Sequence, residues 1–315
     1  MIALAAGAAA DDTRTNDRLL TKSRSDSCSC SMHRGPIVSV SHPGAVHCVT
    51  IGMSVRVPAV RQLLTRPRGA ASDTGSVQRA VARVAAVRVL SVTHGPSVPG
   101  GVFDEAVEAA GHVLERWQVP AGGMPDPATS YDAVMVFGGS QHPDQDERFE
   151  WLARDEEFLR DVLAAEVPVF GVCLGAQMLA RAAGGTVGPA SAPEIGWLDI
   201  SVTPAGVADP VFGVLQPTAT VFQWHHYAFG VPAGGDELAR SAICPQAFRL
   251  AQPAWGIQFH AEVTQAMIAA WVEEDPDDLP MPAADLRGES EARMDRSNEQ
   301  GRALAEAFLR VAASR

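Results

Sequence analysis

The sequence around Cys173 combines a reactive side chain with the small residues that a tight turn needs. An apolar, strand-like run over 167–172 leads into Cys173, and Gly171 and Gly175 stand two residues before and after it. Larger side chains there would collide with the backbone of a sharp strand-to-helix turn, as in Gly-X-Ser-X-Gly hydrolases. A thiol at a helix N-terminus faces the positive end of the helix dipole, which favours the thiolate. The pattern predicts a cysteine nucleophile, although a buried structural cysteine would leave a similar pattern.

A base for such a nucleophile occurs at the end of a second strand-like run. Residues 255–259 are followed by His260, and Glu262 comes two residues later. In an extended chain, positions i and i+2 point the same way, so the carboxylate can fix the imidazole tautomer. Cys173, His260 and Glu262 therefore supply a nucleophile, a base and a group that orients the base.

The elements that position these residues alternate between strands and helices. Strands are predicted at 87–92, 131–137 and 167–172, and a helix at 151–163. Another helical face is predicted from apolar residues at helical spacing: Phe103, Val107, Ala110, Leu114 and Trp117. This order predicts an α/β fold, with a mostly parallel sheet and helices on both faces. Sites in such sheets form at the carboxyl ends of strands, where Cys173 stands.

The second half of the chain has a shorter, more strand-like rhythm. Strands are predicted at 197–202, 220–223, 248–251 and 255–259, and a helix at 263–272. We expect these strands to extend the same sheet.

Composition and charge divide the chain into three parts. Residues 1–85 contain no Phe, Trp or Tyr and carry 11 basic against 5 acidic residues, so we expect a disordered or non-native N-terminal extension. Residues 86–315 carry 14 basic against 32 acidic residues, a net charge of -18 that disfavours nucleic-acid binding. The predicted domain covers 86–272, and 273–315 reads as an acidic linker followed by a helix that docks on it.

The cellular setting follows from the cysteines and the apolar runs. Five scattered cysteines suit a reducing compartment better than a disulfide framework. No apolar run reaches the length of a membrane span, and the apolar start lacks the basic region of a signal peptide. We expect a cytoplasmic protein without membrane contact.

With these motifs in order, residues 86 to about 272 resemble a class I, triad-type glutamine amidotransferase domain, similar to the amidotransferase half of GMP synthases. The resemblance is carried by Gly138-Gly139-Ser140, the run 168–177, Glu194-Ile195-Gly196-Trp197, Gln246-Ala247-Phe248 and the run 256–262. It implies a flavodoxin-like sheet with a few added strands.

The resemblance also implies roles for individual residues. Cys173 would be the nucleophile, His260 the base and then the acid, and Glu262 the orienting carboxylate. The backbone N–H groups of Gly139 and Leu174 would form the oxyanion hole. By analogy, the substrate would contact Gly138, Gln177, His225, His226 and Tyr227. No cofactor is implied.

Two positions depart from the family pattern. Relatives usually have Pro where Ala261 stands, and many read Trp-His-Gly-Asp where this chain has Trp224-His225-His226-Tyr227. The second change alters the space and charge beside the pocket, so glutamine is less secure as the substrate than cysteine-based acyl transfer. Adjacent histidines point in different directions and no Cys or Asp cluster accompanies them, so we expect no metal site.

The predicted reaction is glutamine amide hydrolysis through a γ-glutamyl thioester, giving ammonia and glutamate. The Ser-Gly-Gly-X-Asp-Ser phosphate loop of full GMP synthases is absent from the sequence. Ammonia would therefore pass to a separate synthase subunit, or the protein would be a hydrolase of its own, such as a γ-glutamyl peptidase. A non-catalytic regulatory or binding subunit with the same fold is the alternative from another class.

Overall fold

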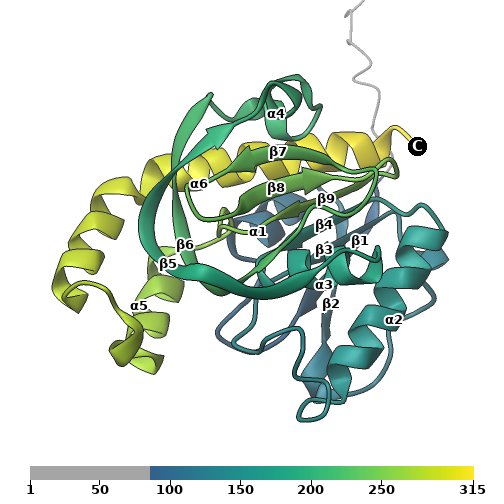
Figure 1. Ribbon diagram of the computed structural model, residues 1–315. Coiled ribbons are helices and arrows are strands. Elements are labelled where there is room, and N and C mark those ends of the chain that lie inside the picture. The colour runs from purple at the N-terminus through teal and green to yellow at the C-terminus, as the bar shows by residue number, and fades with distance from the viewer. Residues whose placement is uncertain (1–85) are drawn as a thin grey trace, which may run out of the picture. The chain divides into compact units, whose positions relative to one another are not determined.

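The structure is a computed structural model that describes residues 86–315, so the prediction for residues 1–85 lies outside the described residues. Figure 1 shows the elements around one central sheet. In chain order they are β1 (Arg88–Thr93), α1 (Gly101–Ala109), β2 (Val113–Gln118), η1 (Val119–Ala121), η2 (Ala128–Ser130), β3 (Ala133–Val136), α2 (Trp151–Ala164), β4 (Val169–Val172), α3 (Leu174–Ala182), β5 (Val187–Val202), α4 (Pro204–Ala208), η3 (Phe212–Val214), β6 (Thr218–Phe229), β7 (Asp236–Arg240), β8 (Pro245–Arg249), β9 (Ala254–Ile257), α5 (Gln265–Glu274), η4 (Pro276–Asp278) and α6 (Ala283–Ala313).

The nine strands form one mixed sheet in the order β2-β1-β3-β4-β9-β8-β7-β5-β6. Strands β2, β1, β3, β4 and β9 pair in parallel, in the 2-1-3-4-5 arrangement of flavodoxin-like folds. The other four pairings are antiparallel. The predicted α/β class and its flavodoxin-like half are confirmed, and the added strands make up half of the pairings.

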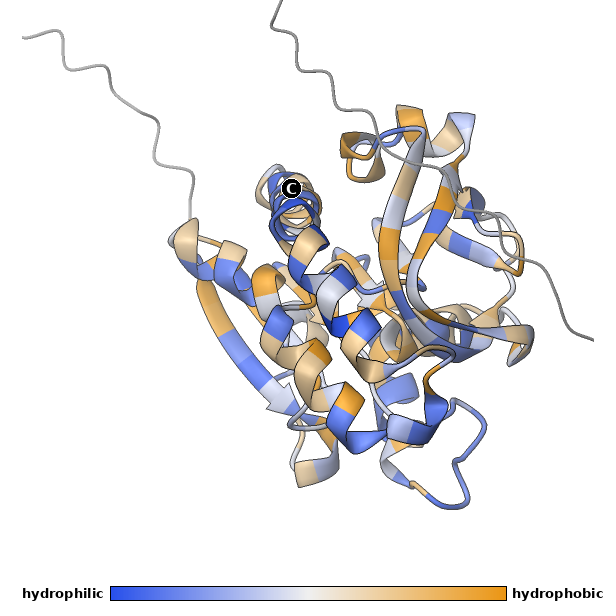
Figure 2. Cartoon of the chain, turned by 90° about the vertical axis from the view of Figure 1, so that its left-hand side faces the viewer, coloured by the Kyte–Doolittle hydropathy of each residue, from blue (hydrophilic) through white to orange (hydrophobic). Residues whose placement is uncertain are grey.

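Helices cover both faces of the parallel half, so its inner strands β1, β3, β4 and β9 are buried on both sides, whereas the edge strand β2 is largely exposed. Met135 and Phe170 belong to a core cluster that includes Phe103 of α1 and Phe308 of α6. Alternate residues of the same strands, such as Val134, pack in a second cluster with residues of α2 and α3. Hydrophobic and hydrophilic residues alternate along these helices (Figure 2), as expected for helices with one face on a sheet.

The predicted helix that was to extend to Trp117 is wrong beyond Ala109. Helix α1 ends there, Gly111 follows with a φ of 75°, and residues 113–118 form the edge strand β2. The N–H of His112 bonds the carbonyl of Val107, which closes the helix end as in a Schellman-type cap. The apolar residues after Gly111 match a helical period by coincidence. They belong to β2, in which the Trp117 ring packs against Phe158 of α2.

The C-terminal helix α6 packs on the described domain along much of its length. Leu304 and Phe308 are fully buried in the cluster under α1, and Leu286 packs in a third cluster with α5. No described helix is long and apolar enough to cross a membrane.

Candidate active site

The turn between β4 and α3 holds Cys173 in a conformation that few residues adopt. Its φ is 51° and its ψ is -111°, and apart from Glu166 it is the only non-glycine residue with a positive φ among residues 86–315. Its N–H donates to the carbonyl of Ile257 at 2.8 Å, which ties the turn to the neighbouring strand β9. A strained backbone of this kind is typical of functional sites that hold a side chain in a fixed direction.

The glycines on either side of Cys173 are required by close backbone contacts. A Cβ at Gly171 would lie 2.8 Å from the backbone of Ala176, and one at Gly175 would lie 2.1 Å from the carbonyl oxygen of Val136. Side chains larger than glycine at these two positions would collide with the backbone, which is the steric reason for which the sequence pattern predicts a sharp turn.

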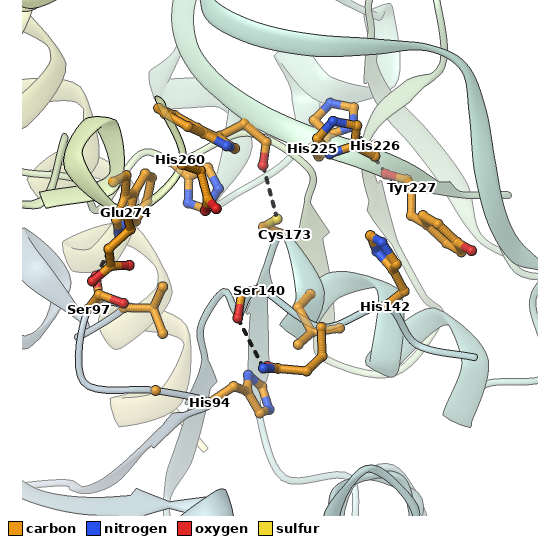
Figure 3. Close-up of a pocket in the computed structure, with 18 of the residues that line it drawn as sticks. His94, Ser97, Ser140, His142, Cys173, His225, His226, Tyr227, His260 and Glu274 are labelled. Carbon is orange, nitrogen blue, oxygen red and sulfur yellow. Dashed lines mark hydrogen bonds between the residues drawn. The ribbon is translucent and has the colours of Figure 1, made fainter. Parts of the chain in front are cut away.

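His260 and Glu262 form a buried pair beside this turn. His260 Nδ1 and Glu262 Oε1 are 2.8 Å apart, and the side chains are 3% and 1% exposed. His260 follows β9, the strand paired with β4, which brings the imidazole next to Cys173 (Figure 3). The Cys173 Sγ is also 3.9 Å from the carbonyl oxygen of Trp224.

Charge at the site favours a protonated His260. Burial alone would lower the pKa of His260, but the Glu262 carboxylate and the Cys173 sulfur raise it to about 10. The ring of Trp271 packs against the imidazole, with the ring centroids 4.8 Å apart, and helps to keep water away. An imidazolium beside the sulfur stabilises a thiolate, the reactive form of cysteine.

The Gly138–Gly139 segment lies beside His260 and Cys173. A Cβ at Gly138 would be 3.1 Å from His260 Cε1 and 3.8 Å from Cys173 Cβ, so this segment borders the sulfur directly. Leu174 is the first residue of α3, where a helix has N–H groups without intrahelical acceptors. Within the described residues, the N–H of Gly139 forms no hydrogen bond either.

The predicted substrate-binding residues line one cavity with Cys173 and His260. The cavity measures about 270 Å³, slightly below the range of about 300–1,000 Å³ that is usual for small-molecule sites, and all of these residues except Gly138 line it. Gln177 is buried in α3, and its Nε2 already donates to the carbonyl of Tyr227 at 2.9 Å. The ring of Tyr227 stacks on His142 at 4.1 Å, and its hydroxyl donates to Asp144.

The two adjacent histidines point in different directions. His226 extends to the cavity rim and pairs with Asp278 at 3.2 Å, and both side chains are more than a third exposed. His225 is buried, and its ring nitrogens contact the carbonyl of Tyr227 at 3.0 Å and the side chain of Gln223 at 3.1 Å. A direct hydrogen bond from His225 to a ligand would have to replace one of these contacts.

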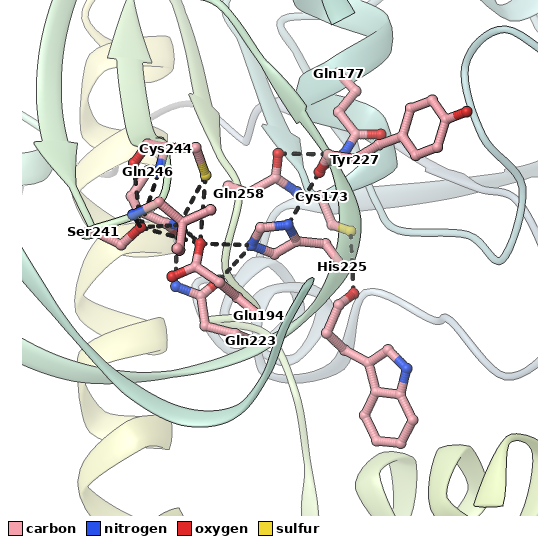
Figure 4. A network of polar contacts seen from close by, with 12 residues as sticks. Cys173, Gln177, Glu194, Gln223, His225, Tyr227, Ser241, Cys244, Gln246 and Gln258 are labelled. Carbon is pink, nitrogen blue, oxygen red and sulfur yellow. Dashed lines mark hydrogen bonds and ion pairs between the residues drawn. The ribbon is translucent and has the colours of Figure 1, made fainter. Parts of the chain in front are cut away.

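Behind His225 lies a buried polar network that the sequence did not predict as a unit (Figure 4). The ligand atoms of Glu194, His225 and Cys244 lie within 4.8 Å of one another, a spacing that would suit a metal ion. However, Gln246 Nε2 donates to Glu194 at 2.8 Å, and Ser241 donates to the same carboxylate. Burial and Glu194 raise the pKa of the Cys244 thiol to about 12, so the group is a neutral thiol in this network. These contacts describe a hydrogen-bond network that fixes the β6 backbone.

One polar pair at the pocket was also missed from the sequence. His94 follows β1 directly, and its buried side chain contacts Asp155 of α2. His94 stands at the carboxyl end of β1, beside that of β3, where the strand order of the sheet reverses and sites commonly form.

The fold and the site together define an α/β protein with a cysteine at a strained strand-to-helix turn beside a buried His–Glu pair. Comparison with known proteins narrows this class. The family model for class-I glutamine amidotransferases matches residues 106–269, and the chain belongs to this family.

Relatives and solved structures agree with this membership. The chain is 30% identical over 207 residues to the glutamine amidotransferase-like protein YfeJ of Salmonella typhimurium, covering 64% of this chain and 85% of that protein. It is 33% identical over 106 residues to a component of the glutamine-hydrolyzing GMP synthase of Haloquadratum walsbyi, covering 33% of this chain and only 56% of that component. A glutamine amidotransferase structure from Thermotoga maritima superposes with a TM-score of 0.65 at 25% identity, covering 70% of this chain and 97% of that one.

Proposed function

We propose that this protein hydrolyses the side-chain amide of glutamine or of a related γ-glutamyl compound, with Cys173 as the nucleophile. The observation that supports this proposal most is the meeting of Cys173, His260 and Gly139 at one cavity, with Glu262 paired to His260 behind it. Membership of the amidotransferase family points to the same substrate class.

In the first half of the reaction, the Cys173 thiolate attacks the amide carbon of the substrate. The carbonyl oxygen becomes an oxyanion and accepts hydrogen bonds from the N–H groups of Gly139 and Leu174. The His260 imidazolium gives its proton to the amide nitrogen, the C–N bond breaks, and ammonia leaves a γ-glutamyl thioester on Cys173. Fixed backbone donors of this kind typically contribute about a hundred- to a thousandfold in turnover.

In the second half, water replaces the sulfur. The now neutral His260 takes a proton from a water molecule that attacks the thioester carbon, and the same oxyanion site holds the charge. The C–S bond breaks, and glutamate leaves with Cys173 and His260 restored as thiolate and imidazolium. Throughout, Glu262 keeps the imidazole oriented and stabilises its charged form.

A specific feature of the cavity supports a γ-glutamyl amine as the second candidate substrate. Because His260 protonates the leaving nitrogen, the leaving group lies on its side of Cys173, where Figure 3 shows Glu274. Asp275 and Asp278 line the same cavity, and no Lys or Arg of the described residues does. These carboxylates favour a neutral or cationic leaving amine over one that carries a carboxylate.

The experiment that tests the proposal measures ammonia and amine release from glutamine, γ-glutamyl dipeptides and γ-glutamyl alkylamines by mass spectrometry. We expect turnover of at least one substrate by the wild-type protein, and none above background by Cys173→Ala. Cys244→Ala, which removes a buried thiol of the polar network, serves as the matched cysteine control and should retain turnover.

Two results would contradict the proposal. One is turnover that survives in Cys173→Ala. The other is a Cys173 that resists a glutamine-analogue electrophile both alone and with a synthase partner, which would indicate a non-catalytic role. The proposal includes a GMP synthase-type partner that consumes the ammonia, by analogy with the relatives that are components of GMP synthases.

A further inference from the structure

His94 is a fully buried histidine whose every polar contact is with an acceptor. Its Nε2 lies 3.1 Å from Asp155 Oδ2, and neither side chain is exposed to solvent. Its Nδ1 lies 2.9 Å from the carbonyl oxygen of Phe137 and 3.1 Å from that of Gly138. The ring also stacks on Trp151, with centroids 5.4 Å apart.

These contacts require both ring nitrogens of His94 to carry a proton. A carboxylate and a carbonyl oxygen accept hydrogen bonds but do not donate them, so a neutral imidazole could satisfy only one side. Burial lowers the pKa of His94, but the charge of Asp155 and the hydrogen bonds outweigh it, so that the pKa is raised. His94 and Asp155 therefore form a buried ion pair. Asp155 Oδ2 contacts His94, whereas Asp155 Oδ1 has no hydrogen-bond partner among the described residues, so this pair is costly to bury.

The two carbonyl groups that His94 holds belong to the segment that borders Cys173. The carbonyl of Gly138 and the N–H of Gly139 are parts of one peptide unit, and no peptide bond among residues 86–315 is cis. In a trans peptide these two groups point in opposite directions. A ring that binds the carbonyl from one side therefore turns the N–H of Gly139 to the other side.

The same peptide also borders Cys173 and His260. Gly138 faces His260 Cε1 and Cys173 Cβ, and Gly139 lies between the side chains of His94 and Leu174. The carbonyl of Phe137 accepts a further hydrogen bond from the N–H of Gly175 in the first turn of α3. His94 therefore binds the same carbonyl group, that of Phe137, to which the first turn of α3 donates a hydrogen bond.

We propose that His94, held by Asp155, is a positioning residue that fixes the Gly138–Gly139 peptide with the N–H of Gly139 directed at the reacting carbonyl oxygen. This inference rests on the proposed function, because it assigns a role within the same reaction. His94 does not touch the substrate oxygen in this role. It acts through the peptide whose orientation it sets.

Two amide substitutions of His94 distinguish a role in positioning the Gly138–Gly139 peptide from a purely structural role of the ion pair with Asp155. In His94→Asn, the side-chain amide nitrogen can occupy the place of Nδ1 and still donate to the Gly138 carbonyl. In His94→Gln, the amide nitrogen can occupy the place of Nε2, so it keeps the contact with Asp155 and loses the grip on the peptide. A positioning role predicts that the Asn variant retains more activity, whereas a structural ion-pair role predicts the reverse.

The expected result in steady-state kinetics is a fall in kcat of about 100-fold for His94→Gln, with KM changed little, and a much smaller fall for His94→Asn. Alkylation of Cys173 by iodoacetamide passes through no oxyanion, so its rate should stay close to wild type in both variants. Equal losses of turnover and of alkylation in the Gln variant would overturn the inference, as would higher activity in the Gln variant than in the Asn variant.

Crystal structures of the two variants provide a readout that does not depend on turnover. We expect the Gly138 carbonyl to keep its direction in His94→Asn and to rotate in His94→Gln. An unrotated peptide in the Gln variant would refute the positioning role. If wild-type protein hydrolyses no γ-glutamyl amide, the proposed function fails, and the peptide orientation still decides what His94 does.

Discussion

The protonation state of His260 depends on two neighbouring groups, the Glu262 carboxylate and the Cys173 sulfur. Both groups favour the protonated form of His260. The raised pKa of His260 has a consequence for folding as well. Its contribution to stability is complete below pH about 6.5 and is lost as the pH rises toward about 10, because the folded protein holds the proton more tightly than the unfolded chain.

Replacing Glu262 with Gln should shift the pH dependence of turnover. Without the carboxylate, the pKa of His260 falls, so the proton for the leaving nitrogen is lost at a lower pH. We expect the alkaline limb of kcat to move from near pH 10 toward neutrality and kcat to fall by about 10²- to 10⁴-fold, as for tautomer-fixing carboxylates in other triads. A pH profile of kcat measures both effects, and an unmoved alkaline limb would show that Glu262 does not control the proton.

Residue chemistry explains which parts of the site the sequence could predict. The turn at Cys173 was predictable because Gly171 and Gly175 have a steric reason to be glycine. His260 and Glu262 were predictable because a two-residue spacing in extended chain is local. His94 was not, because its role depends on Asp155, 61 positions away, and on carbonyl groups that have no sequence signature.

At the scale of elements, helix α6 packs closely against the backbone of the candidate site at Gly301. A Cβ at Gly301 would lie 2.0 Å from the carbonyl oxygen of Ala261, the residue between His260 and Glu262. The helix therefore packs directly on the backbone between His260 and Glu262. At Gly288, near the start of the same helix, a Cβ would meet no atom within 4 Å.

These two glycines predict opposite effects of the same substitution. Gly288→Ala should raise the free energy of unfolding by about 0.5–1 kcal/mol, because alanine has the higher helix propensity. Gly301→Ala should lower it by about 1–3 kcal/mol through overpacking, and should reduce kcat by displacing Ala261. Denaturant unfolding and kinetics of the two variants check this. Equal stability of both variants would contradict the close packing described for α6.

The sequence predicted the inner strands β1, β3, β4 and β9 of the parallel half, because buried parallel strands have the sequence pattern of short apolar runs. It missed β2 and β7, which are not buried on both faces. Half-exposed strands carry polar residues that resemble loops, and the apolar residues of β2 also fit a helical period. The pairing of β5 with β6 across Glu194 and His225 depends on long-range contacts that spacing alone does not indicate.

At the scale of the whole molecule, α6 completes the hydrophobic core. Leu304, Phe308 and Leu309 are buried under the sheet beside residues of α1, β3 and β4. Burial of each such side chain contributes about 1.5–3 kcal/mol, so their sum is comparable with the net stability of a typical domain.

Removing residues 283–315 should therefore abolish cooperative folding. Removing only Ser314 and Arg315, which are exposed, is the control and should leave the thermal midpoint unchanged. Circular dichroism during heating distinguishes the two proteins. A truncated protein with a sharp transition near the wild-type midpoint would show that α6 is an accessory to the fold.

The placement of β9 between β4 and β8 also determines when, during folding, His260 comes next to Cys173. Cys173 directly follows β4, whereas His260 follows β9, which comes much later in the chain. The two strands pair directly. Contacts at such separation form late because the intervening chain must first be ordered. On a ribosome, a nascent chain that ends before residue 254 carries the thiol without its imidazolium. We therefore expect the Cys173 thiol to lack a neighbouring imidazole until residue 260 has been made and β9 has paired with β4.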